Sequence, residues 1–266
     1  MDTIVTVIDD KFFKYIIPWL NSIIKNYPTY PHILVYHHNL NKEQIQYLSG
    51  FERLSLIEID LQKDKIGPTT FRMSKQTYAK YLYFLDTEYD KILHIDPDAL
   101  ILKPLDGLFG QNNFFSVNCI NTNTFRIPRS IYRRIRLKTM LFRDGLKQNS
   151  KFIMNAGVLM IPRRYRTKDN YDYLAYLTRR YFRYLKHRDQ SAINMWMWKN
   201  HIKPSDKIEF NYQSRFFHLP ERNKPPSDIY ILHFVGQHKP DSEWFRNRYD
   251  KEIIDLYDYY ASMRAR

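Results

Sequence analysis

Over residues 1–60, short apolar runs alternate with stretches of helical periodicity. Between the runs, apolar residues recur at the 3.6-residue period and predict helices over 11–26 and 41–50. Pro18 lies inside the first helix and can kink it, and Gly50 suits the end of the second. A β-α-β-α-β order is typical of a parallel sheet, so we expect an α/β fold. The runs that predict its strands are 3–8, 32–36 and 54–59.

The rest of the chain continues the alternation of strands and helices. Residues 121–150 interrupt it with a basic, mostly helical excursion that we expect to lie over the ligand-binding face. We expect one domain over 1–245, followed at 246–266 by a basic, Tyr-rich helix whose amphipathic stretch starts at Trp244. Ser74 suits the N-cap of the next helix. The remaining predicted helices are 75–85, 171–186 and 189–200, and the remaining strands are 92–95, 113–119, 151–161, 207–210 and 229–234.

The stretch from 91 to 106, KILHIDPDALILKPLD, organises the rest of the chain. Its first apolar run predicts a strand buried on both faces, and Pro97 should end the hydrogen-bond ladder. Asp96 and Asp98 flank that proline at the edge of an open α/β sheet where ligands bind. Two hard oxygen ligands suit a divalent cation that carries a diphosphate, although an Asp-x-Asp at a strand end is also a common solvated turn.

A histidine motif follows the last predicted strand. In the segment HFVGQHKP, His233, Gly236 and Lys239 recur at every third residue. An imidazole beside two carboxylates suits Mn²⁺ better than Mg²⁺, because imidazole is the softer ligand. Gly236 would let the backbone approach a phosphate, and Lys239 would supply a point charge for the diphosphate. The alternative is a histidine that has only a structural role at the end of a strand.

Composition limits the class of protein without choosing a partner. With 44% hydrophobic and 26% charged residues, the chain of 266 is globular and long enough for one large domain. Its formal charge of +14 permits an anionic partner such as nucleic acid, an acidic membrane surface or a phosphorylated substrate. The single cysteine, Cys119, excludes an intramolecular disulfide and a cysteine zinc site.

The hydropathy of the sequence bears on the cellular location of the protein. No run approaches the roughly 18 apolar residues that a membrane-spanning helix needs. The chain enters a strand pattern almost at once, without the charged and apolar regions of a secretory signal. We therefore expect a cytoplasmic protein, with peripheral attachment to a membrane as the alternative.

Six stretches together resemble the family-eight glycosyltransferases, the group of glycogenin and the bacterial lipopolysaccharide galactosyltransferases. Each stretch is a weak signal by itself, but they occur in the order of the family's motifs and span about Ile4 to Pro240. The matching stretches are TVIDDKFF at 6–13, MSKQTYAKYL at 73–82, HIDPDALIL at 94–102, MNAGVLMI at 154–161, DQSAIN at 189–194 and HFVGQHKP at 233–240.

The resemblance implies a GT-A fold, which is a Rossmann-like, nucleotide-sugar-binding α/β fold with a mostly parallel central sheet flanked by helices. It implies a UDP-sugar donor and Mn²⁺, with Mg²⁺ as the alternative, held by Asp96, Asp98 and His233. It also implies that the sugar is transferred with retention at the anomeric carbon. The residues implied to bind the donor nucleotide and its diphosphate are Ile8, Asp9, Asp10, Phe13, Lys80, Pro97, Gly236 and Lys239.

The chemistry of that assignment is coherent. A nucleoside diphosphate gains negative charge as the glycosidic bond breaks, and a metal with Lys80 and Lys239 would stabilise it. The sugar becomes oxocarbenium-like, and an amide oxygen or a carboxylate can stabilise its face. By the motif match, Asn155, Asp189 and Gln190 would surround the donor sugar and the reacting centre. Asp189 is also a good N-cap, which is its purely structural interpretation.

The chain departs from the family's pattern at several positions. Lys80 stands where arginine is usual, and Asp241 follows Lys-Pro where tryptophan is common. Asn121 stands where the family often has an aspartate, and an amide cannot act as a charged base. Residues 122–150 match no family motif, so we expect the acceptor to be recognised there.

The leading hypothesis is a Mn²⁺-dependent retaining enzyme that moves a hexose from a UDP-sugar to a glycan, lipid-linked or protein acceptor. The basic residues of 126–151 and of the C-terminus favour an anionic acceptor or contact with an acidic membrane surface, and a solvated basic face is the equal alternative. A nucleic-acid-binding protein with a vestigial nucleotide fold would leave Asp96, Asp98 and His233 unexplained, so we expect no nucleic-acid partner. A nucleotidyltransferase is disfavoured because no glycine-rich loop follows the first strand.

Overall fold

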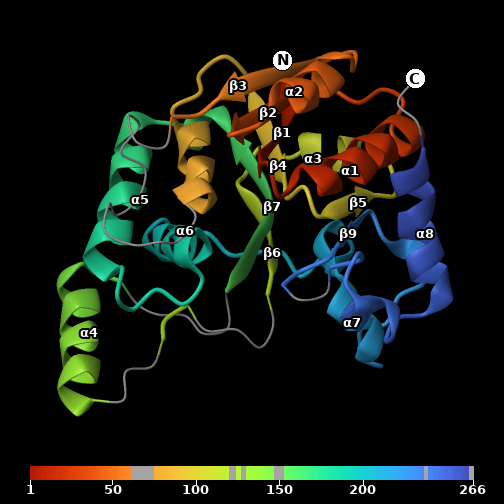
Figure 1. The fold of residues 1–266 in the computed structure, drawn as a ribbon. Helices are drawn as coiled ribbons and strands as arrows, with labels where there is room; N and C mark the ends of the chain where they lie inside the picture. Colours follow the sequence, from red (N-terminus) through yellow and green to blue (C-terminus); the bar gives the residue numbers. More distant parts are fainter. Residues whose placement is uncertain (61–74, 120–123, 127–129, 147–152, 237–238, 264–266) are drawn as a thin grey trace.

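The computed structural model describes residues 1–60, 75–119, 124–126, 130–146, 153–236 and 239–263. Its centre is a six-stranded sheet in the order β3-β2-β1-β4-β7-β6 (Figure 1). The strands β3, β2, β1 and β4 pair in parallel, whereas β7 runs antiparallel to both β4 and β6. The predicted α/β fold with a mostly parallel sheet is therefore confirmed. The strands are β1 (Asp2–Asp9), β2 (His32–His38), β3 (Leu54–Glu58), β4 (Lys91–Ile95), β6 (Phe115–Asn118) and β7 (Met154–Pro162).

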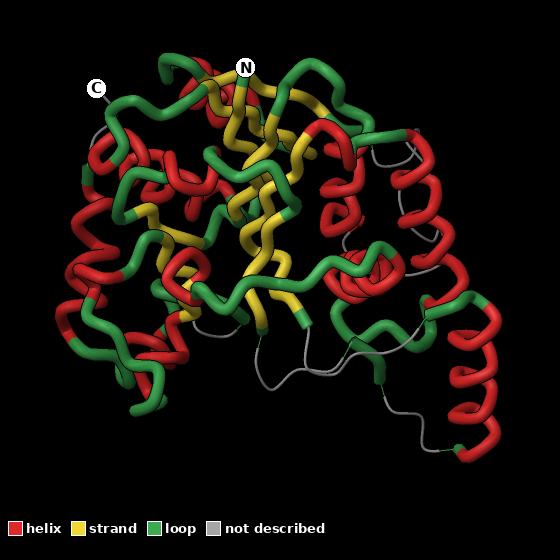
Figure 2. Tube along the Cα trace, turned by 180° about the vertical axis from the view of Figure 1, so that it is seen from behind, coloured by secondary structure: helices red, strands yellow, loops and turns green. Residues whose placement is uncertain are grey.

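Helices cover both faces of this sheet (Figures 1 and 2). Successive residues of β1 point to opposite faces, as the two-residue period of a strand requires. Ile4 and Ile8 pack in the apolar cluster beneath α1, while Val5 packs in the opposite cluster with residues of α5 and α6. Burial on both faces explains why β1, β2 and β4 are mostly apolar, whereas no residue of the edge strand β3 is buried. The helices concerned are α1 (Phe13–Asn26), α5 (Lys168–Tyr181) and α6 (Arg188–Lys199).

A second, three-stranded sheet has the order β5-β9-β8. Its first two strands pair antiparallel, with Ala99 opposite His233. Because β4 ends at Ile95 and β5 begins at Ala99, the chain passes from one sheet to the other through Asp96–Asp98. The strands of the second sheet are β5 (Ala99–Ile101), β8 (Tyr212–Gln213) and β9 (Ile231–His233).

The C-terminal helix packs on the first helix of the chain. The side-chain amide of Asn21 donates to the carbonyl oxygens of Tyr260 and Met263 across 2.8 and 3.0 Å. The predicted single helix over 246–266 is corrected, because α8 (Lys251–Ser262) follows a separate short helix, α7 (Glu243–Arg246). Within these bounds α8 itself is acidic. Against the single cation Lys251, α8 carries Glu252, Asp255 and Asp258.

The predicted strand over 207–210 was wrong. These residues instead enter a 3₁₀ helix, η3 (Ile208–Asn211), which precedes β8. Ile208 and Phe210 pack into the core, and an alternation this short cannot separate a strand from a turn of helix. Ser74, the predicted helix cap, and Lys151, the predicted start of a strand, lie outside the described residues. The other helices are α2 (Lys42–Ser49), α3 (Asp106–Phe109), α4 (Ile131–Arg143), η1 (Lys75–Phe84), η2 (Arg163–Tyr165), η4 (Ser214–His218) and η5 (Pro226–Asp228).

Candidate active site

Two carboxylates lie where the chain leaves the large sheet. The backbone N–H of Asp96 still donates to the carbonyl oxygen of Gly157 on β7, across 2.8 Å. Pro97, which has no N–H to donate, is buried directly after it, and Asp98 then leads into β5 of the second sheet. The predicted end of the ladder is therefore confirmed, and the two side chains are held at the junction between the sheets.

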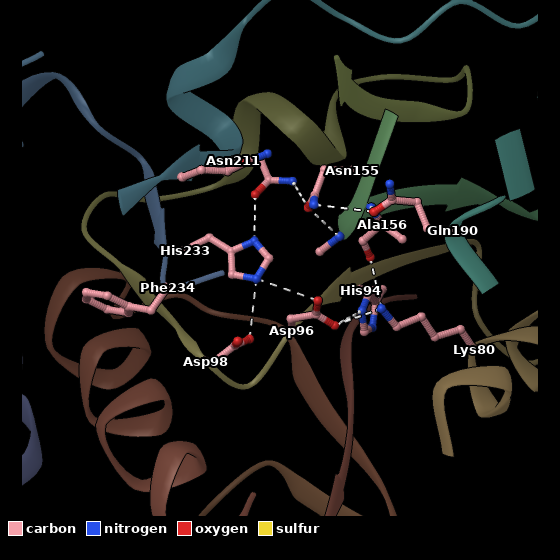
Figure 3. A network of polar contacts seen from close by, with 12 residues as sticks. Lys80, His94, Asp96, Asp98, Asn155, Ala156, Gln190, Asn211, His233 and Phe234 are labelled. Atoms are coloured by element: carbon pink, nitrogen blue, oxygen red, sulfur yellow. Dashed lines mark hydrogen bonds and ion pairs between the residues drawn. The ribbon is translucent and has the colours of Figure 1, made fainter. Parts of the chain in front are cut away.

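The pairing of β5 with β9 brings His233 to these carboxylates (Figure 3). The N–H of Phe234 donates to the carbonyl oxygen of Asp98 across 2.9 Å, which fixes the two segments in register. The Nε2 atom of His233 lies 3.4 Å from Oδ1 of Asp98 and 3.6 Å from Oδ2 of Asp96. Ligand atoms of the three residues all lie within 4.8 Å of one another, close enough to hold one metal ion.

The hydrogen bonds of His233 determine which ring nitrogen faces the carboxylates. Asn211 donates through Nδ2 to Oδ1 of Asn155 across 2.9 Å, so its own Oδ1 is the acceptor that faces His233. Nδ1 of His233 lies 2.9 Å from that oxygen and must carry the proton. Burial lowers the pKa of His233 to about 4, so the ring is neutral and Nε2 presents its lone pair to Asp96 and Asp98.

Gly157 makes room for the imidazole. A Cβ atom at this position would overlap Cε1 and Nδ1 of His233 and would crowd Oδ1 of Asn155. Small residues inside a strand, as at 155–157, permit the close approach of another group. The group that approaches is the side chain of His233, so Gly157 and His233 form one unit.

A second set of contacts holds the other oxygen of Asp96. Its Oδ1 accepts from Nζ of Lys80 across 2.8 Å and lies 2.9 Å from Nε2 of His94. The other ring nitrogen of His94 lies 3.2 Å from the hydroxyl of Tyr83. Burial by itself would raise the pKa of Asp96, but Lys80 and His94 hold that pKa well below its usual range. Asp96 is therefore a carboxylate at neutral pH, with Oδ2 directed toward His233.

Lys80 joins this group to the start of α6. Its ammonium lies 3.6 Å from Oδ2 of Asp189 and donates to the carbonyl oxygen of Ala156 across 3.1 Å. Burial alone would lower the pKa of Lys80, yet Asp96 and Asp189 together raise it, so the lysine stays charged. Next to Asp189, Gln190 presents Oε1 to Nδ2 of Asn155 and to the N–H of Ala156, each at 3.4 Å.

The sequence model of the family described as "Glycosyl transferase family 8" matches residues 3–246, almost the whole chain. The protein belongs to glycosyl transferase family 8. A search of curated proteins finds no significant match.

Solved glycosyltransferases share the fold of this family 8 enzyme. The galactosyltransferase LgtC, in complex with donor and acceptor sugar analogs, has a TM-score of 0.73 at 18% identity, covering 99% of this chain and 98% of its own. The bifunctional WbbM in its apo form has a TM-score of 0.70 at 17% identity, covering 98% of this chain and 49% of its own. GlyE of Streptococcus pneumoniae TIGR4 has a TM-score of 0.63 at 20% identity, covering 98% and 60%. The protein is thus a glycosyltransferase by family, and these similarities support the GT-A fold.

Lys239 of the family 8 enzyme lies against Asp96, Asp98 and His233, the candidate metal-ligand group. Its ammonium donates to Oδ2 of Asp98 and, across 2.9 Å, to the carbonyl oxygen of Phe234. It also lies 5.7 Å from the ring centroid of Phe12 and 5.6 Å from that of Tyr15. Burial lowers the pKa of Lys239 to about 8. Gly236 precedes it with φ of +64°, a left-handed conformation that glycine adopts without strain.

The predicted nucleotide-contacting residues lie at the end of β1 and directly after it, and β1 runs parallel beside β4. Oδ1 of Asp9 accepts from the N–H of Phe12 across 2.9 Å and turns the chain into α1. Asp10 is exposed and Phe13 is half-buried, so both side chains remain accessible to a ligand. Ile8, in contrast, is buried in the core, and only its backbone is available.

Two residues of this network were missed by the sequence analysis. His94 lies on β4 two positions before Asp96, which extends the strand's hydrogen-bond ladder by one residue, and that spacing puts both on the same face, so the signal was present. Asn211 carries no comparable signal, because it ends a short 3₁₀ helix outside every motif. Asn121, which stands where the family often has an aspartate, lies outside the described residues.

Proposed function

We propose that the protein is a Mn²⁺-dependent retaining glycosyltransferase that moves a hexose from a UDP-sugar to an acceptor glycan or glycolipid. The observation that supports this most is the convergence of Nε2 of His233 with one oxygen each of Asp96 and Asp98. Three lone-pair donors directed at one another repel unless a cation lies among them. The family membership and the donor and acceptor analogs bound to LgtC add support for a nucleotide-sugar substrate.

The donor set suits a borderline divalent ion. Asp96 and Asp98 would supply carboxylate oxygens and His233 a neutral imidazole nitrogen, which favours Mn²⁺ over Mg²⁺. Each carboxylate has its second oxygen held by a lysine, Lys80 for Asp96 and Lys239 for Asp98. When bound, the ion would neutralise charge on the diphosphate of the donor.

Lys239 and Lys80 have different parts in this proposal. Lys239 is partly accessible and close to Asp98, so it would stabilise the negative charge that develops on the departing UDP. Lys80 is enclosed by Asp96, Asp189 and Ala156, so it would orient the ligand Asp96 and would act on the phosphates only through it. The presence of lysine instead of the usual arginine at 80 fits a single buried ammonium between two carboxylates.

Gln190 and Asn155 are the residues that we place at the donor sugar. Both are half-buried, and their amide groups meet at 3.4 Å beside the metal-ligand group. An amide oxygen of Gln190 can stabilise the oxocarbenium-like sugar without carrying a charge. Asp189 is only 5% exposed and is paired with Lys80, so we assign it the positioning of that lysine.

The experiment that tests the proposal measures the melting temperature with UDP, GDP, CMP or ADP, each with Mn²⁺ or with EDTA. A ligand at about a hundred times its Kd stabilises the folded state by about 2.7 kcal/mol. We expect UDP with Mn²⁺ to raise the midpoint, EDTA to remove the shift, and Asp98→Asn to abolish it. Asp172→Asn, which removes an exposed carboxylate on α5, is the control and should keep the shift. A metal-independent shift, or one caused by another nucleotide, would refute the UDP and Mn²⁺ assignments.

A further inference from the structure

Helix α4 carries an apolar stripe that faces away from the protein. It projects from the body of the molecule at the end opposite α8 (Figures 1 and 2). Phe142 is 86% exposed, Ile131 61% and Ile135 56%. At about 100° per residue, these three side chains fall within about 40° of one another, so they form one stripe along the helix. The buried residues Leu137 and Leu141 lie about 120° away and hold α4 to the core.

Cations border this stripe on both sides. Lys138 and Arg134 follow one edge, while Arg143 and Arg136 follow the other, beyond Tyr132, which is 81% exposed. No carboxylate occurs between Ile131 and Arg143. An exposed apolar stripe between two rows of Lys and Arg is typical of a helix that lies in the interface of an anionic bilayer.

The helix is anchored firmly enough to serve as a docking element. Asp144, which follows its last turn, accepts from Nη2 of Arg180 across 3.0 Å and from the hydroxyl of Tyr181 across 2.7 Å, both on α5. Leu146 is buried directly after this clamp. The outward stripe is therefore presented by a helix whose opposite face and C-terminal end are fixed to the protein.

We propose that α4 docks the protein on the surface of an anionic lipid bilayer, with Phe142, Ile135 and Ile131 inserted among the headgroups. The positive charge of α4 favours an anionic bilayer over a second copy of the protein, because two α4 helices packed together would bring like charges together. The same reasoning excludes α8 as the docking helix, since three of its four charged side chains are acidic. No helix in the described ranges is long and apolar enough to span a membrane.

The test is flotation of the purified protein with vesicles of phosphatidylcholine, alone or partly replaced by phosphatidylglycerol, without any acceptor glycan. We expect binding only to the phosphatidylglycerol vesicles, weakening as salt is added. Phe142→Ser should weaken partitioning about tenfold. Replacing Lys138 and Arg143 by Gln should weaken it about fivefold for each cation, the equivalent of about 1 kcal/mol.

A matched control removes one exposed apolar residue and one exposed cation from another helix. Ile24 is 40% exposed and lies beside the exposed Lys25 at the end of α1. Ile24→Ser with Lys25→Gln should leave partitioning unchanged, whereas Phe142→Ser with Lys138→Gln should abolish it at unaltered melting temperature. The proposal is overturned if the protein does not float with anionic vesicles, if both double variants bind equally, or if Phe142→Ser instead dissociates a dimer.

Discussion

Nδ1 of His233 lies 2.9 Å from Oδ1 of Asn211, and this contact keeps Nε2 of the same ring available to a metal. Asn211→Leu removes the acceptor and leaves the ring free to rotate or to change tautomer. We expect affinity for Mn²⁺ to fall about 10–100-fold, measured by isothermal titration calorimetry. Asn26→Leu removes a half-buried amide, bonded to Ile101 and Tyr260, and should lower only the melting temperature. Equal Mn²⁺ affinities in the two variants would contradict the role of Asn211.

Gly157→Ala tests whether glycine is required at this position to make room for the imidazole ring of His233. The added methyl group overlaps the ring of His233, so the ring must move away from Asp96 and Asp98. We expect loss of Mn²⁺ binding together with a lower melting temperature. Gly107→Ala is the control, because a Cβ there meets nothing within 4 Å and alanine favours the helix α3. Normal Mn²⁺ binding by the Gly157 variant would show that His233 is not needed as a ligand.

Lys80→Met leaves two carboxylates, the half-buried Asp96 and the buried Asp189, without the cation between them. Removing one partner from a buried ion pair costs about 3–5 kcal/mol of unfolding free energy, which urea denaturation can measure. Lys168→Met breaks a fully exposed pair with Asp172 and should change little. If the Lys80 variant is as stable as wild type, one of the carboxylates must bind a proton in its place.

Gln190→Ala should separate chemistry from stability. Within the described part of the chain, its amide hydrogen-bonds Asn155 and Ala156, each across a long 3.4 Å, so its loss should barely change the melting temperature. If the amide stabilises the sugar in the transition state, release of UDP from the UDP-sugar should fall about 100-fold. Asp189→Asn should show the reverse pattern, a lower melting temperature with a smaller loss of rate, because it acts through Lys80. A larger loss of rate in the Asp189 variant than in the Gln190 variant would mean that Asp189, and not Gln190, acts on the donor sugar.

His37 makes the stability depend on pH. It lies on β2 away from the metal-ligand group, and burial lowers its pKa below the ordinary 6.5. The unfolded chain therefore binds this proton at a higher pH than the folded protein, so the free energy of unfolding falls as the pH falls below about 6.5. We expect His37→Phe, measured in EDTA, to lose less stability than wild type between neutral pH and pH 5. An identical slope in both proteins would mean that folded His37 accepts the proton without cost.

Local pattern predicted much of the fold, because strands and helices bury their apolar residues at characteristic periods. The parallel order of β1, β2 and β3 followed from two such periods alternating along the N-terminal part of the chain. The excursion at 121–150 was expected to be basic and mostly helical, and α4 confirms a helix within it. The short alternation at 207–210 led to a wrong prediction of a strand, because a run of four residues fits the strand period and the helical period equally well.

The sequence by itself determined which chemical groups the site could contain. Asp96 and Asp98 follow an apolar strand, and His233 follows another, so their types and their places at strand ends were readable from order and hydropathy alone. Only the tertiary structure decided how they meet. The chain changes sheets between Ile95 and Ala99, and the register of β5 against β9 sets His233 beside both carboxylates.

The same holds for the groups that orient the site. The orienting residues come from separate segments: Lys80, His94, Asn155 and Asn211. No local pattern predicts that Lys80 lies between two carboxylates, or that Asn211 determines the tautomer of His233. Such contacts depend on long-range packing, which places side chains to within a fraction of an ångström. Pattern along the chain specifies which face a residue occupies, whereas the packing of both sheets and their helices specifies its neighbours.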